Sequence, residues 1–169
     1  MEYLIVPPGA RHTAAWAGGT TEELYIWPES AQYARRDFAF RVSTATVALT
    51  ESDFTALPGI TRWIMPLQGH MRLRHEGHED VTLAPLEAHC FAGGRHTRSY
   101  GQCTDFNLML SAGWQGRIGA GTACFSCPPG GFAGVFAPSG PVTVSVDSSH
   151  EELAHREMLV ARGPGSVAI

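Results

Sequence analysis

The chain has 169 residues, a net charge of −4 and a hydrophobic content of 44%, values that suit one domain with a substantial core. All 12 basic residues are arginines scattered along the chain, so we expect no nucleic-acid partner, and the absence of lysine excludes Schiff-base catalysis. The apolar run near the N-terminus is too short for a signal peptide or a membrane helix. We therefore expect a cytoplasmic protein with reduced cysteines and no membrane partner.

Glycines and prolines interrupt the sequence about every ten residues and leave short segments rich in Val, Ile, Thr and aromatic residues. This spacing is typical of an all-β barrel or sandwich. The expected strands cover residues 23–27, 38–49, 61–67, 70–75, 80–83, 105–110, 116–120, 122–127, 142–146 and 158–161. Two short helical segments are expected at residues 52–57 and 150–155.

Glycine turns at Gln68-Gly69 and Glu76-Gly77 predict antiparallel hairpins, for which a jelly roll is the economical closure. A glycine-rich second portion begins near residue 112 and also has the character of strands. We expect a single domain over residues 1–169, in which two stacked barrels or half-barrels could meet near residue 112.

The sequence offers no strong metal or nucleophile motif. It contains no His-x-His pair, and the group HEGHE at residues 75–79 is expected to be exposed at the tip of a hairpin. Cys124 and Cys127 would point to opposite faces of a strand, while Cys90 and Cys103 are expected to be small buried residues. No serine lies in a Gly-x-Ser-x-Gly elbow. We expect no catalytic residue, metal or cofactor.

Two arginines, Arg41 and Arg62, lie inside apolar or β-branched segments. A guanidinium stays charged and cannot be left unpaired in a core, so each requires an anionic partner. For Arg41 that partner is either an internal carboxylate, from Glu23 or Asp105, or a bound ligand. Ser43 lies two residues from Arg41 and therefore shares its face of the strand, an arrangement that suits the binding of a carboxylate.

Asp105 and Asn107 also share a face, either as contacts in a pocket or as hydrogen-bonding groups at the end of a strand. The aromatic residues Trp16 and Phe54 are expected to form core or pocket walls.

Five ordered segments resemble the HutD/Ves family of small bacterial cupin-fold proteins. They are WAGGTTEE at residues 16–23, FRVSTA at 40–45, FTALPGITR at 54–62, FAG at 91–93 and DFNLM at 105–109. The first segment lacks the Lys-Asn and the third glycine usual in the family. The resemblance implies a cupin-like jelly-roll barrel, with a bicupin as the variant, that forms a homodimer and lacks the established enzymatic chemistry of many cupins.

For the histidine-utilisation branch the resemblance also implies a regulatory role with a small carboxylate, such as N-formylglutamate or urocanate, in the barrel. Arg41 and Arg62 would hold the carboxylate, and Ser43, Thr21 and Asn107 would add hydrogen bonds. Two alternatives stay open. One is an enzyme acting on a small organic acid with Glu23 or Asp105 as general base, and the other is a structural or protein-interaction module.

Overall fold

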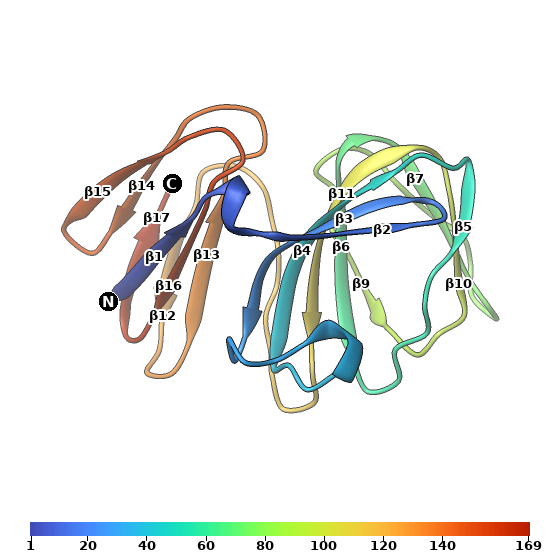
Figure 1. The fold of residues 1–169 in the computed structure, drawn as a ribbon, viewed down its shortest axis with the longest axis horizontal. Coiled ribbons are helices and arrows are strands. Elements are labelled where there is room, and N and C mark those ends of the chain that lie inside the picture. The colour runs from blue at the N-terminus through green and yellow to red at the C-terminus, as the bar shows by residue number, and fades with distance from the viewer. The chain divides into compact units, whose positions relative to one another are not determined.

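The computed structural model describes residues 1–169, and nearly all of its regular structure is β-strand. The helical segments are two single 3-10 turns, η1 (Pro8–Ala10) and η2 (Tyr33–Arg35). No helix is long and apolar enough to cross a membrane. The prediction of an all-β protein is therefore confirmed (Figure 1).

The strands belong to two compact units. The main unit comprises His12–Gly119, and the terminal unit combines Met1–Arg11 with Ala120–Ile169. Each unit consists of two antiparallel sheets.

In the main unit, a six-stranded sheet is paired with a four-stranded one. The six-stranded sheet has the order β2 (His12–Trp16), β3 (Gly19–Trp27), β4 (Phe40–Val47), β11 (Cys103–Leu110), β6 (Thr61–Gly69) and β9 (His89–Ala92). The four-stranded sheet has the order β5 (Glu51–Asp53), β10 (Thr97–Tyr100), β7 (Met71–His75) and β8 (Val81–Leu83). Both sheets contribute to one apolar core, which includes Ile64, Leu73 and Phe91. The two inner faces thus pack against each other as in a sandwich.

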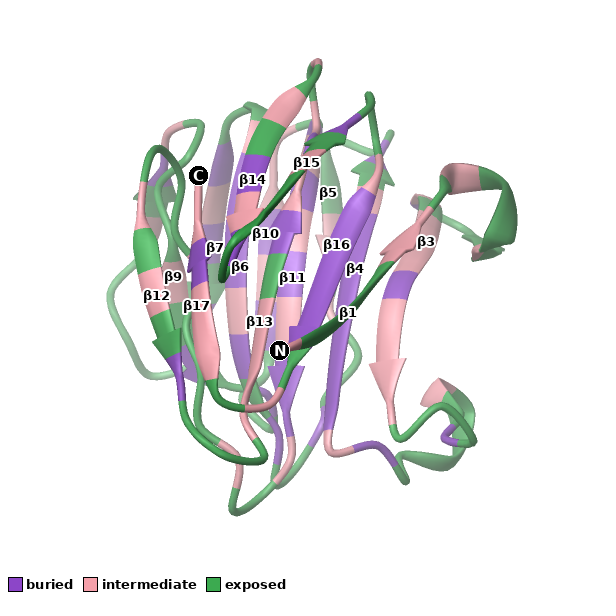
Figure 2. Ribbon diagram, turned by 90° about the vertical axis from the view of Figure 1, so that its left-hand side faces the viewer, coloured by how far each residue is buried: buried purple, intermediate pink, exposed green.

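The terminal unit has a three-stranded sheet in the order β1 (Glu2–Val6), β16 (Met158–Arg162) and β13 (Phe132–Phe136). Its second sheet has the order β12 (Cys124–Cys127), β17 (Gly165–Ala168), β14 (Val142–Val146) and β15 (Ser149–Leu153). Strand β16 is buried over most of its length (Figure 2) because it lies between β1 and β13. Val144, Leu153, Leu159 and Val167 are fully buried in the core between the two sheets.

Neither of the two expected helical segments forms, so both predictions were wrong. Ser52 and Asp53 belong to strand β5 and residues 54–57 have no regular structure, while residues 150–153 belong to β15. A two-residue turn at Asp147-Ser148 reverses the chain, so that Val146 pairs with Ser149. Asp147 has φ of 50°, a left-handed conformation that Asp tolerates better than most residues. The pairing of β15 with β14 therefore outweighs the local preference for a helix.

The hairpin expected at Gln68-Gly69 was also wrong. Strand β6 pairs with β9 and β11, whereas β7 pairs with β8 and β10. The turn is thus a corner at which the chain passes from one sheet to the other. Gly69 has φ of 78°, and a Cβ there would lie 2.5 Å from the backbone oxygen of Gln102, so the corner requires glycine. The second expected hairpin, at Glu76-Gly77, is confirmed by the pairing of β7 with β8.

Two smaller expectations also failed. Residues 116–120 form no strand, consistent with the poor strand propensity of their glycines. Cys90 is exposed, because Phe91 occupies the inward position of the short strand β9. Cys103 is buried as expected, and none of the four cysteines forms a disulfide.

Candidate functional site

Polar side chains gather on three neighbouring strands of the six-stranded sheet. In the paired register, Met109 of β11 lies between Arg41 of β4 and Arg62 of β6. Two residues along, Asn107 lies opposite Ser43 on one side and Ile64 on the other. Because alternate residues of a strand share a face, these side chains point to the same side of the sheet.

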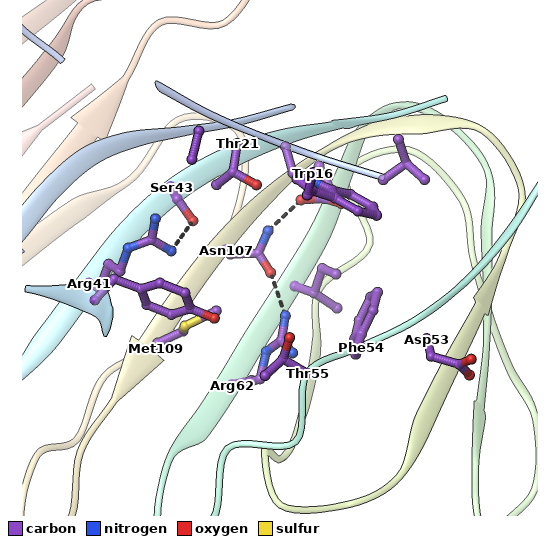
Figure 3. Close-up of a pocket in the computed structure, with 16 residues that line it drawn as sticks. Trp16, Thr21, Arg41, Ser43, Asp53, Phe54, Thr55, Arg62, Asn107 and Met109 are labelled. Carbon is purple, nitrogen blue, oxygen red and sulfur yellow. Dashed lines mark hydrogen bonds between the residues drawn. The ribbon is translucent and has the colours of Figure 1, made fainter. Parts of the chain in front are cut away.

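They line a cavity of about 270 Å³ that lies entirely within the main unit (Figure 3). Its lining also includes Trp16 of β2, Thr21 of β3, Tyr33 of η2 and Phe54. The volume is at the small end of ligand pockets and suits a small metabolite. The wall combines apolar and aromatic groups with a few polar ones, as ligand sites usually do.

Arg41 has an internal partner. Its Nε donates to Oε2 of Glu23 at 2.6 Å, and its Nη1 donates to Ser43 Oγ at 3.2 Å. The guanidinium also lies 4.3 Å from the ring centre of Tyr33. An irregularity in the pairing of β3, between Glu23 and Tyr25, leaves Glu23 opposite Ser43 and diagonal to Arg41. Of the alternatives for Arg41, the ion pair with Glu23 is therefore formed.

Arg62 has no such partner. It is 7% exposed, and its hydrogen bond is a long one of 3.4 Å from Nη2 to Asn107 Oδ1. Its Nε is buried without any hydrogen-bond acceptor. The guanidinium lies 4.7 Å from the ring centre of Phe54 and 5.3 Å from that of Phe91, and such cation–π contacts stabilise a charge only in part. Burial lowers the pKa of Arg62, but an arginine remains protonated at neutral pH.

Asp105 is the second unpaired charge at the cavity. It is 2% exposed and accepts a hydrogen bond from Nδ2 of Asn107. Asn107 thus bridges Arg62 and Asp105, accepting from the first and donating to the second (Figure 3). Burial raises the pKa of Asp105 to about 7, although Arg62 and the hydrogen bond from Asn107 lower it. This carboxyl group therefore changes its protonation state near neutral pH.

Eight of the nine residues expected at a ligand site line this one cavity: Trp16, Thr21, Arg41, Ser43, Phe54, Arg62, Asp105 and Asn107. The ninth, Glu23, is not part of the lining and instead pairs with Arg41. Sequence reasoning missed Tyr33 and Met109. Met109 is one alternation beyond Asn107, a signal that was present, whereas Tyr33 lies in a loop without any periodic pattern.

A pair of histidines, His75 and the partly buried His89, packs on Phe91, whose ring also contacts Arg62. His75 ends β7 and is 2% exposed, so the expectation that it lies exposed at a hairpin tip was wrong. Its Nε2 lies 3.1 Å from Nε2 of His89, and its ring packs 4.7 Å from that of Phe91. Burial lowers the pKa of both histidines. No group of three His, Cys, Asp or Glu side chains has the geometry of a metal site.

Comparisons with known proteins identify the family and the fold of the chain. The model of the HutD family matches residues 10–169. A conserved protein of unknown function, PA5104 from Pseudomonas aeruginosa PAO1, is 23% identical, with a TM-score of 0.77 over 99% of this chain and 92% of its own. HutD from Pseudomonas fluorescens SBW25 is 24% identical, with a TM-score of 0.70 over 98% and 93% of the two chains.

More distant structures share the fold. Oxalate decarboxylase from Lactobacillus farciminis is 10% identical, with a TM-score of 0.64 over 98% of this chain and 81% of its own. No curated protein matches the chain at a significant level. The expected cupin-like fold is confirmed, and at this identity the oxalate decarboxylase supports the fold alone.

Proposed function

Because this chain belongs to the HutD family, we propose that it is a binding protein that holds a small carboxylate metabolite in the cavity and acts in regulation rather than turnover. The candidate ligands are the histidine-utilisation intermediates N-formylglutamate and urocanate. The observation that carries the proposal is Arg62, which is buried with its Nε unsatisfied and with no carboxylate partner.

An unpaired buried charge is costly, and a protein retains one where a partner arrives from outside. A ligand carboxylate at Arg62 would accept from Nε and supply the direct hydrogen-bond acceptor that this atom lacks. Phe54 and Phe91 hold the guanidinium from two directions, which fixes its orientation before the ligand binds. Ser43, Thr21 and Trp16 line the same cavity and would contact the remainder of the ligand.

Arg41 was expected to hold the ligand carboxylate together with Arg62, but in this proposal it does not bind the anion directly. Since its Nε is occupied by Glu23, Arg41 contributes to the shape and polarity of the cavity, and Arg62 is the anchor for the anion. A ligand with a second carboxylate would have to compete with Glu23 for Arg41. The geometry therefore gives one strong anion position.

A ligand screen by thermal unfolding tests the proposal. At about 100 times the dissociation constant, a ligand should stabilise the folded state by roughly 2.7 kcal/mol, which raises the Tm by about 5 to 10 °C for a chain of this size. N-formylglutamate, urocanate and glutamate form the panel. Replacing Arg62→Met should abolish the shift, while Arg72→Met should preserve it because Arg72 is an exposed residue paired with Asp80. No shift with any acid would contradict the proposal and favour a structural role.

One observation favours a second candidate, an enzyme acting on a small organic acid. Asp105 lies in the cavity wall with its pKa raised to about 7, a value that suits a general base at neutral pH. Glu23, the other base considered, is tied to Arg41 and is less available. Incubating the purified protein with each bound acid and following product formation separates the two candidates, since a binding protein leaves the acid unchanged.

A further inference from the structure

The charged side chains at the cavity sum to zero when Asp105 is ionised. Arg41 and Glu23 neutralise each other at 2.6 Å, and the exposed Asp53 of the cavity wall lies 3.5 Å from Arg98. What remains on the polar floor is the Arg62 guanidinium and the Asp105 carboxyl group, joined through Asn107. When Asp105 is ionised, the two balance, and the empty cavity has no net charge.

A bound carboxylate upsets this balance. It engages Arg62 and adds one negative charge to a site in which Asp105 is only 2% exposed. Two carboxylates that share one buried cation cannot both remain ionised without a large desolvation cost. The site regains neutrality when one of them gains a proton. The ligand carboxylate would bond to Arg62 directly, whereas Asp105 is joined to Arg62 only through Asn107, so Asp105 is the group that receives the proton.

Building on the proposed function, we infer that the cavity takes up its carboxylate ligand together with one proton from solvent, and that the proton resides on Asp105. The protonated carboxyl group keeps its bond from Asn107 on one oxygen and gains an O–H donor on the other. That donor can hydrogen-bond to the ligand, which an ionised Asp105 would repel. Asp105 thus becomes a ligand-binding group in the complex.

Other titratable groups near Asp105 do not take this role. Cys103, on the same strand, has its pKa raised to about 12 by burial and stays a neutral thiol. Asp53 of β5 lines the cavity but is exposed and lies 3.5 Å from Arg98. The ring of Tyr33 of η2 packs against the guanidinium of Arg41, at 4.3 Å from the ring centre. The raised pKa of Asp105 agrees with the charge count.

Titration calorimetry tests the inference directly. N-formylglutamate and urocanate are titrated at pH 5.5, 7 and 8 in two buffers of different ionisation enthalpy, and the difference in heat gives the number of protons taken up. We expect uptake approaching one proton at pH 8 and falling towards zero at pH 5.5, where Asp105 is already protonated. The Kd should correspondingly rise as the pH increases, by up to about tenfold per unit above pH 7.

Asp105→Asn is the matched variant, because the amide mimics the protonated carboxyl group in shape and can still accept from Asn107. This variant should bind at pH 8 without taking up a proton on residue 105. Subtracting its proton uptake from that of the unmodified protein removes any contribution from a proton that binds to the urocanate ring. Asp80→Asn removes an exposed carboxylate outside the cavity and should leave the uptake unchanged.

The outcomes are distinguishable. Binding by the unmodified protein with no proton uptake at pH 8 overturns this inference and leaves the proposed function standing. The same uptake in Asp105→Asn also overturns it, since the proton would then reside elsewhere. Absence of binding by both acids at every pH overturns the inference and the proposed function together.

Discussion

Arg41 and Arg62 flank Met109 on the two strands that pair with β11, on the same face of the sheet, yet their charges are neutralised in different ways. Arg41 is neutralised by Glu23 at 2.6 Å, whereas Arg62 keeps a buried Nε without an acceptor. The two residues therefore predict opposite effects of substitution on the stability of the ligand-free protein.

Arg41→Ala should destabilise the protein. It leaves Glu23, a largely buried carboxylate, without its cation, and removing one member of a buried pair typically costs about 3 kcal/mol or more. Urea unfolding measures the free energy. Arg35→Ala serves as the control, because Arg35 forms an exposed pair with Asp37 and should cost less than about 1 kcal/mol. Equal losses in the two variants would show that the Arg41 pair contributes nothing special.

Arg62→Met should leave the ligand-free protein at pH 6 as stable as the unmodified protein, or more stable. Methionine fills a similar volume between Phe54 and Phe91 and has no unsatisfied donor. At pH 6 most of Asp105 is protonated and does not need the arginine. A loss of more than about 2 kcal/mol in urea unfolding would instead assign Arg62 a structural role.

The ligand-free protein should lose stability from Asp105 as the pH rises from about 4 to about 7. The folded pKa of about 7 lies above the ordinary value of 3.8, so the folded state binds more protons in that window and is favoured at its acidic end. The total effect is on the order of 3 to 4 kcal/mol at most. Asp105→Asn should lack this component, and its stability relative to the unmodified protein should increase between pH 4 and pH 8. Parallel pH curves for the two proteins would contradict the raised pKa.

His75 and His89 should remain neutral below the pH at which exposed histidines become charged, because burial lowers the pKa of both. Thr97 Oγ1 donates to the Arg95 carbonyl, so it accepts from Nδ1 of His75, which leaves Nε2 of His75 to accept from His89. Their depressed pKa values cost stability as the pH falls below about 6.5. Nitrogen NMR of the rings checks both points, and a His75 ring that becomes charged near the ordinary histidine pKa of about 6.5 would contradict them.

Gly19→Ala should destabilise the main unit by about 2 kcal/mol or more. A Cβ at this position would lie 1.8 Å from the backbone oxygen of Thr46, which pairs with the neighbouring residue of β3. The strand would have to move away from its partner. Gly9→Ala is the control, since nothing lies within 4 Å of its Cβ position. Similar Tm values for the two variants would show that the strands adapt freely.

The sequence predicted best those strands that have alternating patterns and β-branched residues. Strands β4, β6, β7 and β11 were expected within a few residues of their observed bounds. Strands β1, β2, β9, β10, β13 and β17 were missed, and β5 and β15 lie where helical segments were expected. Strand β2 is exposed along its length, and β1 pairs with β16 across more than 150 residues of sequence. Such strands form because a neighbouring strand provides backbone hydrogen bonds, and the local sequence pattern does not reveal that neighbour.

The site divides in the same way. Alternation along single strands correctly placed Arg41 with Ser43, and Asp105 with Asn107, on shared faces. The choice of Glu23 over Asp105 as the partner of Arg41 depends on the irregular pairing of β3 with β4. The burial of His75 depends on the packing of β7 against β9 and β10. Register and packing between distant segments decide both, so neither followed from spacing alone.

The position of β2 has a consequence for how the cavity exchanges its contents. Trp16 belongs to the outermost strand of the six-stranded sheet, which is held by β3 on one side, whereas Arg62 and Asp105 lie on strands paired on both sides. Backbone amide hydrogens on such an edge strand exchange with solvent through small local openings, whereas exchange from β11 requires a much larger unfolding event. The backbone amides of β2 should therefore exchange with deuterium long before those of β11. A ligand would reach Arg62 through a local opening of β2 that leaves the strands of Arg62 and Asp105 in place.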